Sequence, residues 1–116
     1  MEKILHLKSE IEKILDNNKA KDIKSINLKD KSPVADFMII ASGNSSRHMQ
    51  ALSEMILEKF KKEGIKNCNL EGKESAEWKL IDGVDIIVHI FHPEKRKYYD
   101  LEKMWSELLP KERVMI

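Results

Sequence analysis

A short turn between an apolar run and an amphipathic segment is the first place where this sequence could carry chemistry. Residues 42–46 read Ser-Gly-Asn-Ser-Ser, and backbone N–H groups in such a turn before a helix can hold a phosphate. The turn lacks the lysine of a P-loop and the three glycines of a dinucleotide fingerprint. Arg47 and His48 stand where a nucleotidyltransferase would carry magnesium-binding acids. The pattern favours a plain strand, turn and capped helix, and a nucleotide-binding or nucleotidyltransferase enzyme is the alternative.

Histidine, serine and cysteine side chains provide no second catalytic pattern. His89 and His92 lie three positions apart on a strand and point to opposite faces, so joint metal ligation with His48 would need a bend. The sequence has no Gly-x-Ser-x-Gly elbow, and Cys68 has no identifiable activating partner. We therefore expect no catalytic residue, no cofactor and no metal.

The tryptophans and tyrosines all lie in the C-terminal half of the chain. They are Trp78, Tyr98, Tyr99 and Trp105. These residue types favour interfaces because they combine apolar area with one polar group, although for Trp105 we expect packing on the sheet. Between residues 71 and 85, five acids stand against two lysines, a local net charge of −3. An acidic, aromatic surface suits a basic protein partner.

The elements that would position these residues follow from hydrophobic periodicity and turn chemistry. We expect helices over 2–17, from Ser45 or Ser46 to Gly64, and over 94–109, with strands over 22–28, 37–41, 66–70, 78–81 and 84–91. The first strand should lie near an edge and the last should be central. Asp82-Gly83 predicts a tight hairpin with positive φ at both central positions. The fold class is α/β, with a mixed sheet of about five strands and flanking helices.

Length and composition limit the class of protein. The chain has 116 residues, 21 basic against 20 acidic, which argues against DNA or bare RNA as a partner. It has one cysteine and no N-terminal signal pattern or membrane-spanning apolar run, so we expect a soluble cytoplasmic protein that does not bind membranes. One domain should cover 1–110, with a flexible tail over 111–116.

Several separate blocks of the sequence together resemble the ribosomal silencing factor family, also called RsfS or Iojap-like. The blocks are residues 35–48, Glu71-Gly72, residues 76–78, residues 85–91 and residues 99–105, so the resemblance covers about 4–106. It implies a nucleotidyltransferase-like α/β fold without the catalytic acidic pair. One departure is at the hairpin, where the family usually reads Asp-x-Gly-Asp and this chain reads Asp82-Gly83-Val84-Asp85.

The resemblance also implies a function. Family members bind the large ribosomal subunit through its protein fourteen and block association with the small subunit, which represses translation. Carried over by position, Trp78 is the first contact candidate, followed by Leu80, His89 and Tyr99. The acidic, aromatic pattern adds Asp85 and Tyr98 to the partner-binding residues. The sequence leaves a homodimer open.

Overall fold

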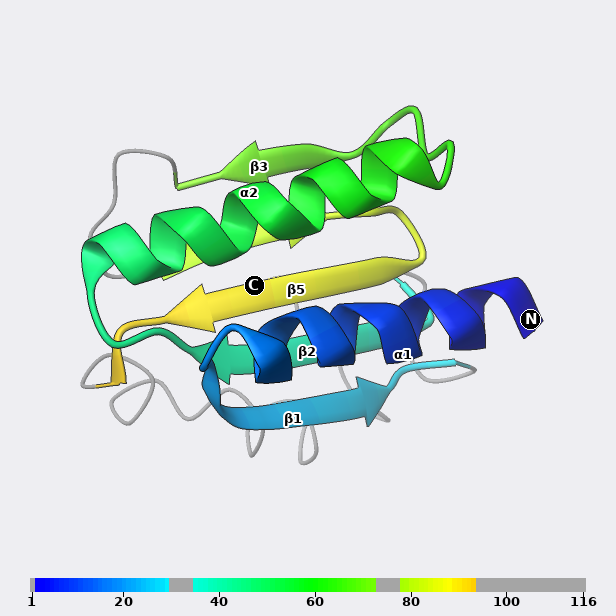
Figure 1. Ribbon diagram of the computed structural model, residues 1–116. Coiled ribbons are helices and arrows are strands. Elements are labelled where there is room, and N and C mark those ends of the chain that lie inside the picture. Colours follow the sequence, from blue (N-terminus) through cyan, green and yellow to red (C-terminus); the bar gives the residue numbers. More distant parts are fainter. Residues whose placement is uncertain (1, 30–34, 73–77, 94–116) are drawn as a thin grey trace.

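The computed structural model describes residues 2–29, 35–72 and 78–93 of the chain. Within these residues, two helices and five strands follow one another (Figure 1). They are α1 (Glu2–Asn17), β1 (Lys21–Asn27), β2 (Phe37–Ser42), α2 (Ser46–Lys62), β3 (Asn69–Glu71), β4 (Trp78–Asp82) and β5 (Ile86–Phe91). The order confirms the predicted α/β class as far as β5. The helix expected over 94–109 and the tail over 111–116 lie outside the described residues.

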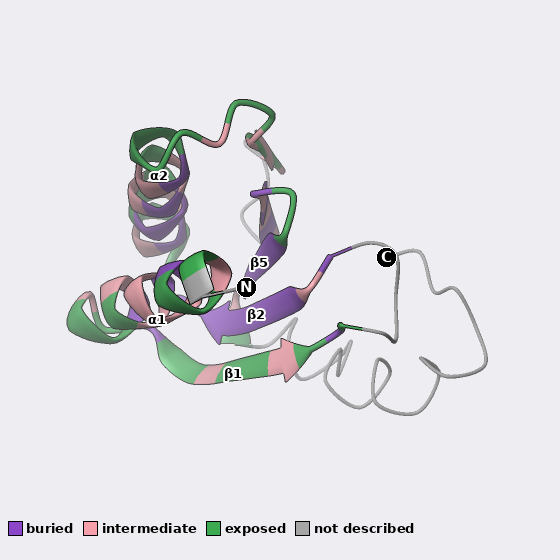
Figure 2. Cartoon of the chain, turned by 90° about the vertical axis from the view of Figure 1, so that its right-hand side faces the viewer, coloured by how far each residue is buried: buried purple, intermediate pink, exposed green. Residues whose placement is uncertain are grey.

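The five strands form one mixed sheet in the order β1-β2-β5-β4-β3. The two central strands, β2 and β5, run parallel, and the other neighbouring pairs are antiparallel. Every residue of β2 and β5 is buried, as their predominantly apolar sequences predict (Figure 2). β1 lies at an edge, in agreement with its charged composition, and β3 is shorter than the strand expected over 66–70.

Both described helices cover the same face of the sheet (Figures 1 and 2). The apolar stripes of α1 and α2 supply fully buried side chains to one core. These include Ile11, Leu15, Met49, Leu52, Ile56 and Phe60. Alternate residues of the strands, such as Ile39, Ile81 and Val88, complete this core from the sheet. The predicted helical periodicity thus determines which side of each helix packs on the sheet.

The opposite sheet face carries a second, smaller apolar cluster. Leu28, Met38, Ile40 and Phe91 are buried in it, and Ile26 and Trp78 pack against it. The members come from β1 and the residue after it and from β2, β4 and β5, because alternate residues on each strand point away from the helices. Trp78 therefore lies on the sheet face opposite α1 and α2.

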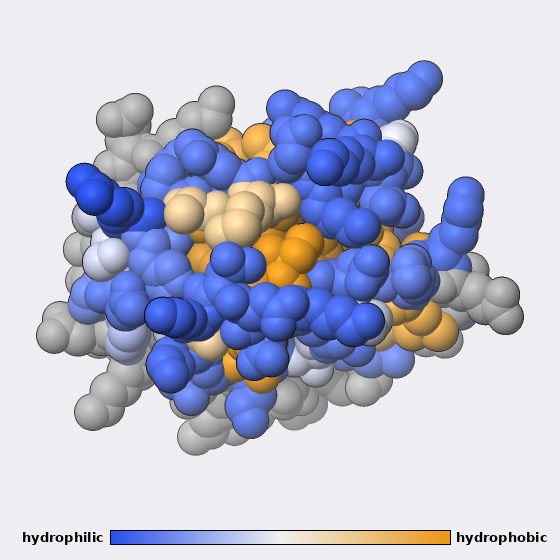
Figure 3. Space-filling view, in the orientation of Figure 1, coloured by the Kyte–Doolittle hydropathy of each residue, from blue (hydrophilic) through white to orange (hydrophobic). Residues whose placement is uncertain are grey.

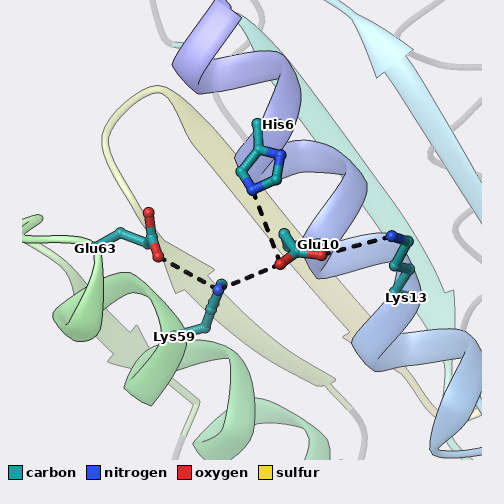
Figure 4. Close-up of polar contacts among 5 residues, drawn as sticks. All are labelled: His6, Glu10, Lys13, Lys59 and Glu63. Carbon is teal, nitrogen blue, oxygen red and sulfur yellow. Dashed lines mark ion pairs between the residues drawn. The ribbon is translucent and has the colours of Figure 1, made fainter.

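The two helices are also joined by charged side chains at their outer surface. The Lys59 ammonium lies 3.7 Å from a carboxylate oxygen of Glu10 on α1 and 3.3 Å from one of Glu63 (Figure 4). His6 and Lys13 add contacts of 3.9 and 3.8 Å to Glu10. A small apolar patch shows between the helices in Figure 3, where Ile14, Ala51 and Met55 line a shallow hollow. Partly exposed ion pairs of this kind add little to stability, so the apolar core holds the helices in place.

The ends of the helices agree with the sequence in all but one detail. Ser45 is the N-cap of α2 and its hydroxyl accepts the His48 N–H at 3.1 Å, while Gly64 follows α2 with φ +81°. α1 ends at Asn17 as expected. The left-handed residue after it is Lys19, with φ 68°, where glycine is the usual residue. Asn18 donates its side-chain amide to the Ile14 carbonyl at 2.8 Å.

The hairpin between β4 and β5 corrects the predicted two-residue turn. Val84, not Gly83, has the positive φ, at 71°. The Asp85 N–H donates to the Gly83 carbonyl at 2.8 Å and closes a three-residue turn around Val84. Gly83 is required for another reason: a methyl group on it would lie 2.5 Å from the Phe60 ring. The prediction was wrong because it treated the turn as local, whereas a helix side chain decides where the glycine must be.

Candidate functional site

The Ser42–Ser46 turn, where the sequence first suggested phosphate binding, already uses backbone donors within the protein. The Gly43 N–H donates to the Phe91 carbonyl at 3.0 Å, and the Asn44 N–H donates to His48 Nδ1 at 3.0 Å. The His48 N–H is taken by the N-cap Ser45. These three N–H groups are therefore not presented to an anion. The geometry favours the plain strand, turn and capped helix over the nucleotide-binding alternative.

His48 connects the beginning of α2 to the end of α1. Its Nε2 lies 2.7 Å from the Asn18 carbonyl oxygen, which can only accept, so Nε2 donates and Nδ1 accepts from Asn44. Both ring nitrogens are thus engaged in holding the turn. In the part of the chain that the structure describes, no group of three or more His, Cys, Asp or Glu side chains is placed to hold a metal ion.

Three of the predicted partner-binding residues come together on the sheet face opposite the helices. Leu80 of β4 pairs with His89 of β5, and Trp78 pairs with Phe91. Side chains of directly opposed residues share a face, so these four lie side by side. We call them the Trp78 face. Trp78 and Leu80 are half-buried, whereas His89 and Phe91 are buried.

His89 is the chemically unusual member of the Trp78 face. It is 3% exposed, and its ring stacks on that of Phe91 with centroids 5.8 Å apart and planes 6° from parallel. Its Nδ1 is buried and has no hydrogen-bond partner within the described part of the chain. Burial lowers the pKa of His89 from 6.5 to about 4, so the ring is neutral at physiological pH. It therefore contributes a neutral, flat ring beside Leu80 and Phe91.

The other predicted site residues are placed elsewhere or lie outside the described residues. Asp85 is exposed in the β4–β5 turn, at the opposite end of β4 from Trp78. Its carbonyl oxygen accepts the N–H groups of Asp36 and Phe37 at 2.9 and 3.1 Å, so its backbone has a structural role. Tyr98 and Tyr99 lie outside the described residues. The structure thus brings together Trp78, Leu80 and His89 and separates Asp85 from them.

Three residues near Trp78 were not among the sequence-based candidates. Gly72 packs against the Trp78 indole, and the ammonium of the buried Lys79 donates to the Gly72 carbonyl at 2.9 Å. Glu71 is exposed and pairs with Leu80, which places an acid on the same face. The alternation of bulky and polar residues in β4 could have indicated that Lys79 faces the core. Its contact with Gly72 depends on the β3–β4 register, which that alternation does not determine.

The described residues form a small α/β domain whose candidate site is an apolar, aromatic face with an acid beside it, the composition of a protein-binding module. None of their helices is both long enough and apolar enough to cross a lipid bilayer. The profile of the family described as "Ribosomal silencing factor during starvation" (RsfS) matches residues 1–115. The chain belongs to this family of ribosome-associated repressors of translation.

Individual relatives agree with the family match. A ribosomal silencing factor from Halalkalibacterium halodurans is 41% identical over 93 residues, which cover 80% of each chain. One from Bacillus subtilis is 38% identical over 92 residues, covering 79% of this chain and 78% of the relative. A crystal structure of a Chromobacterium violaceum protein superposes with a TM-score of 0.82 at 34% identity, over 89% of this chain and 86% of that one. The resemblance seen in the sequence is confirmed, and so is the fold class.

Proposed function

We propose that this chain acts in the cytoplasm by binding the large ribosomal subunit through its protein fourteen and blocking association with the small subunit. Family membership supports a role at the ribosome. The Trp78 face supports a protein partner, because it joins a half-buried tryptophan to apolar neighbours and an exposed acid. The observation that carries the proposal is the position of Trp78, which lies on the sheet face away from both described helices.

The partner surface that would fit this face is apolar at its centre and basic at its rim. Leu80 and Trp78 would enter the desolvated centre, and Glu71 would lie at the edge beside Leu80. Among the residues proposed from the sequence, His89 would pack beside Leu80 at the centre, while Asp85 would contribute at most a distant rim charge. Tyr98 and Tyr99 stay candidates by position in the sequence. An interface of ordinary size would occupy the subunit surface sterically without any chemical step.

Trp78→Ala should weaken binding to purified large subunits by about 2 kcal/mol, roughly a thirtyfold loss of affinity, as for a hot-spot aromatic. Co-sedimentation at a series of protein concentrations measures the loss. Leu5→Ala is the matched control, because Leu5 is a large apolar residue, 46% exposed, on α1 at the other side of the sheet. It should pellet like the wild type.

A second measurement tests the consequence for the ribosome. Added in excess to separated subunits, the wild type should lower the fraction of joined ribosomes in a sucrose gradient, and Trp78→Ala should lower it much less. Equal pelleting of Trp78→Ala and the wild type would show that Trp78 is not part of the interface. Failure of the wild type to pellet with large subunits at all would refute the proposed function.

A further inference from the structure

The backbone at the end of β3 lies directly against the indole of Trp78. A methyl group on Gly72 would lie 3.2 Å from both Cε3 and Cζ3 of Trp78 and 2.8 Å from its carbonyl oxygen. Gly72 also has φ +78°, a conformation that L side chains rarely adopt. The six-membered part of the indole therefore packs on a position that has room only for hydrogen atoms.

A buried ammonium group holds this glycine in place from the other side of the strand. Lys79 is 2% exposed, and its Nζ donates to the Gly72 carbonyl at 2.9 Å. A buried charge is tolerated only when it is well hydrogen-bonded, and a bond from an ammonium is stronger than one from a neutral donor. Gly72 lies one residue beyond Glu71, whose pairing with Leu80 is the last of the β3–β4 ladder. The Lys79 side chain thus anchors the backbone where strand pairing stops.

We propose that Gly72 and Lys79 form a cradle that holds the Trp78 indole in the orientation that the partner recognises. The proposal rests on the proposed function, because it needs Trp78 to be a contact residue. Gly72 limits the indole on one side, and the neighbouring Phe91 of the Trp78 face limits it on another. A side chain that is fixed before binding loses less conformational freedom in the complex. In this arrangement Gly72 and Lys79 are positioning residues that affect affinity without touching the partner.

The central test is Gly72→Ala in a Trp105→Phe background, in which Trp78 is the only tryptophan. The added methyl group should displace the indole, which shifts the emission maximum of Trp78 and raises its quenching by acrylamide. Binding to large subunits should fall about tenfold, part of the loss expected for removing the whole side chain. Gly64→Ala is the matched control, since Gly64 has nearly the same φ, +81°, but nothing within 4 Å of an added methyl group. It should change neither the fluorescence nor the binding.

A second pair of variants tests the hydrogen bond from Lys79 to the Gly72 carbonyl. These variants also test the proposal if Gly72→Ala does not fold. Lys79→Met keeps the buried apolar stem and removes the ammonium, and it should change Trp78 fluorescence and binding in the same direction as Gly72→Ala. Lys79→Arg restores a charged donor and should recover at least part of both. Circular dichroism melts would identify any variant that has simply unfolded.

Different outcomes would refute the cradle and the proposed function. Unchanged Trp78 fluorescence in folded Gly72→Ala and Lys79→Met proteins would overturn the cradle, even if Trp78→Ala still weakens ribosome binding. Altered fluorescence with unchanged pelleting would overturn the link between indole orientation and affinity. If Trp78→Ala itself pelleted like the wild type, the result would refute Trp78 as a contact residue. It would not bear on the packing of the indole, which the fluorescence measures.

Discussion

The most informative single residue for solution measurements is His89. It is a neutral ring in an apolar face, with Ile40 on one neighbouring strand and Leu80 on the other. Among the described residues its Nδ1 has no hydrogen-bond partner that could stabilise a proton there. Burial lowers its pKa to about 4, and the physical cause is desolvation of the charged form. This makes the stability of the fold depend on pH through one identified side chain.

The sign of the dependence follows from the two protonation states. Below pH 6.5 the unfolded chain binds a proton at His89, whereas the folded chain stays neutral until about pH 4. The unfolded state therefore gains protons first, and the free energy of unfolding decreases as pH falls through this window. The full difference in the pKa of His89 would lower the free energy of unfolding by about 3 kcal/mol between pH 6.5 and pH 4. Urea denaturation at half-unit pH steps measures the effect.

His89→Leu should flatten that part of the stability curve, because the titrating group is gone. His6→Leu provides the comparison, since the His6 side chain is 72% exposed and its removal leaves the buried ring in place. A His89→Leu protein with the same loss of stability between pH 6.5 and pH 4 as the wild type would show that another group is responsible.

Among the elements, the β4–β5 hairpin carries a strain that one substitution should relieve. Val84 has φ 71°, and a β-branched residue is unfavourable in this region. Val84→Gly should raise the free energy of unfolding by about 1 kcal/mol, the strain relieved less the added flexibility of the unfolded chain. Chemical denaturation at neutral pH measures the gain. A lower stability than the wild type would contradict the assigned turn.

The neighbouring glycine gives the matched comparison within the same turn. Gly83→Ala should lower the free energy of unfolding by about 2 kcal/mol, because the new methyl group would overlap the buried Phe60 ring. If Gly83→Ala lowers the free energy of unfolding and Val84→Gly raises it, the turn needs a glycine at position 83 for space and at position 84 for backbone conformation. This chain supplies a glycine only at the first.

The elements also show what the sequence can and cannot predict. β2 and α2 were predictable, since an apolar run, a serine cap and a periodic stripe are local signals. The turn around Val84 was not, because Phe60 reaches it from a helix more than twenty residues earlier. At the candidate site, alternation along β4 puts Trp78 and Leu80 on one face. The pairing of Leu80 with His89 depends on the register between two strands, which only the assembled sheet determines.

At the scale of the whole molecule, binding to a protein and binding to RNA would draw on different parts of the charge distribution. The chain has a net charge of +1, yet an exposed acid, Glu71, lies beside Leu80 on the Trp78 face. A direct RNA-binding mode would instead draw on basic residues such as Arg47, Lys95, Arg96 and Lys97, and it would respond to net charge. The two modes therefore respond differently to the position of an added positive charge.

Glu71→Lys and Glu58→Lys change the net charge equally but on different sides of the sheet. Glu58 is an exposed residue of α2, on the face that the helices cover. Against purified ribosomal protein fourteen, Glu71→Lys should weaken binding on the order of tenfold at low salt, chiefly by slowing association, and Glu58→Lys should have little effect. The difference should shrink as added salt screens the rim charge. If both variants instead bound large subunits more tightly and bound free ribosomal RNA with steep salt dependence, RNA would be the main partner and the assigned face would be wrong.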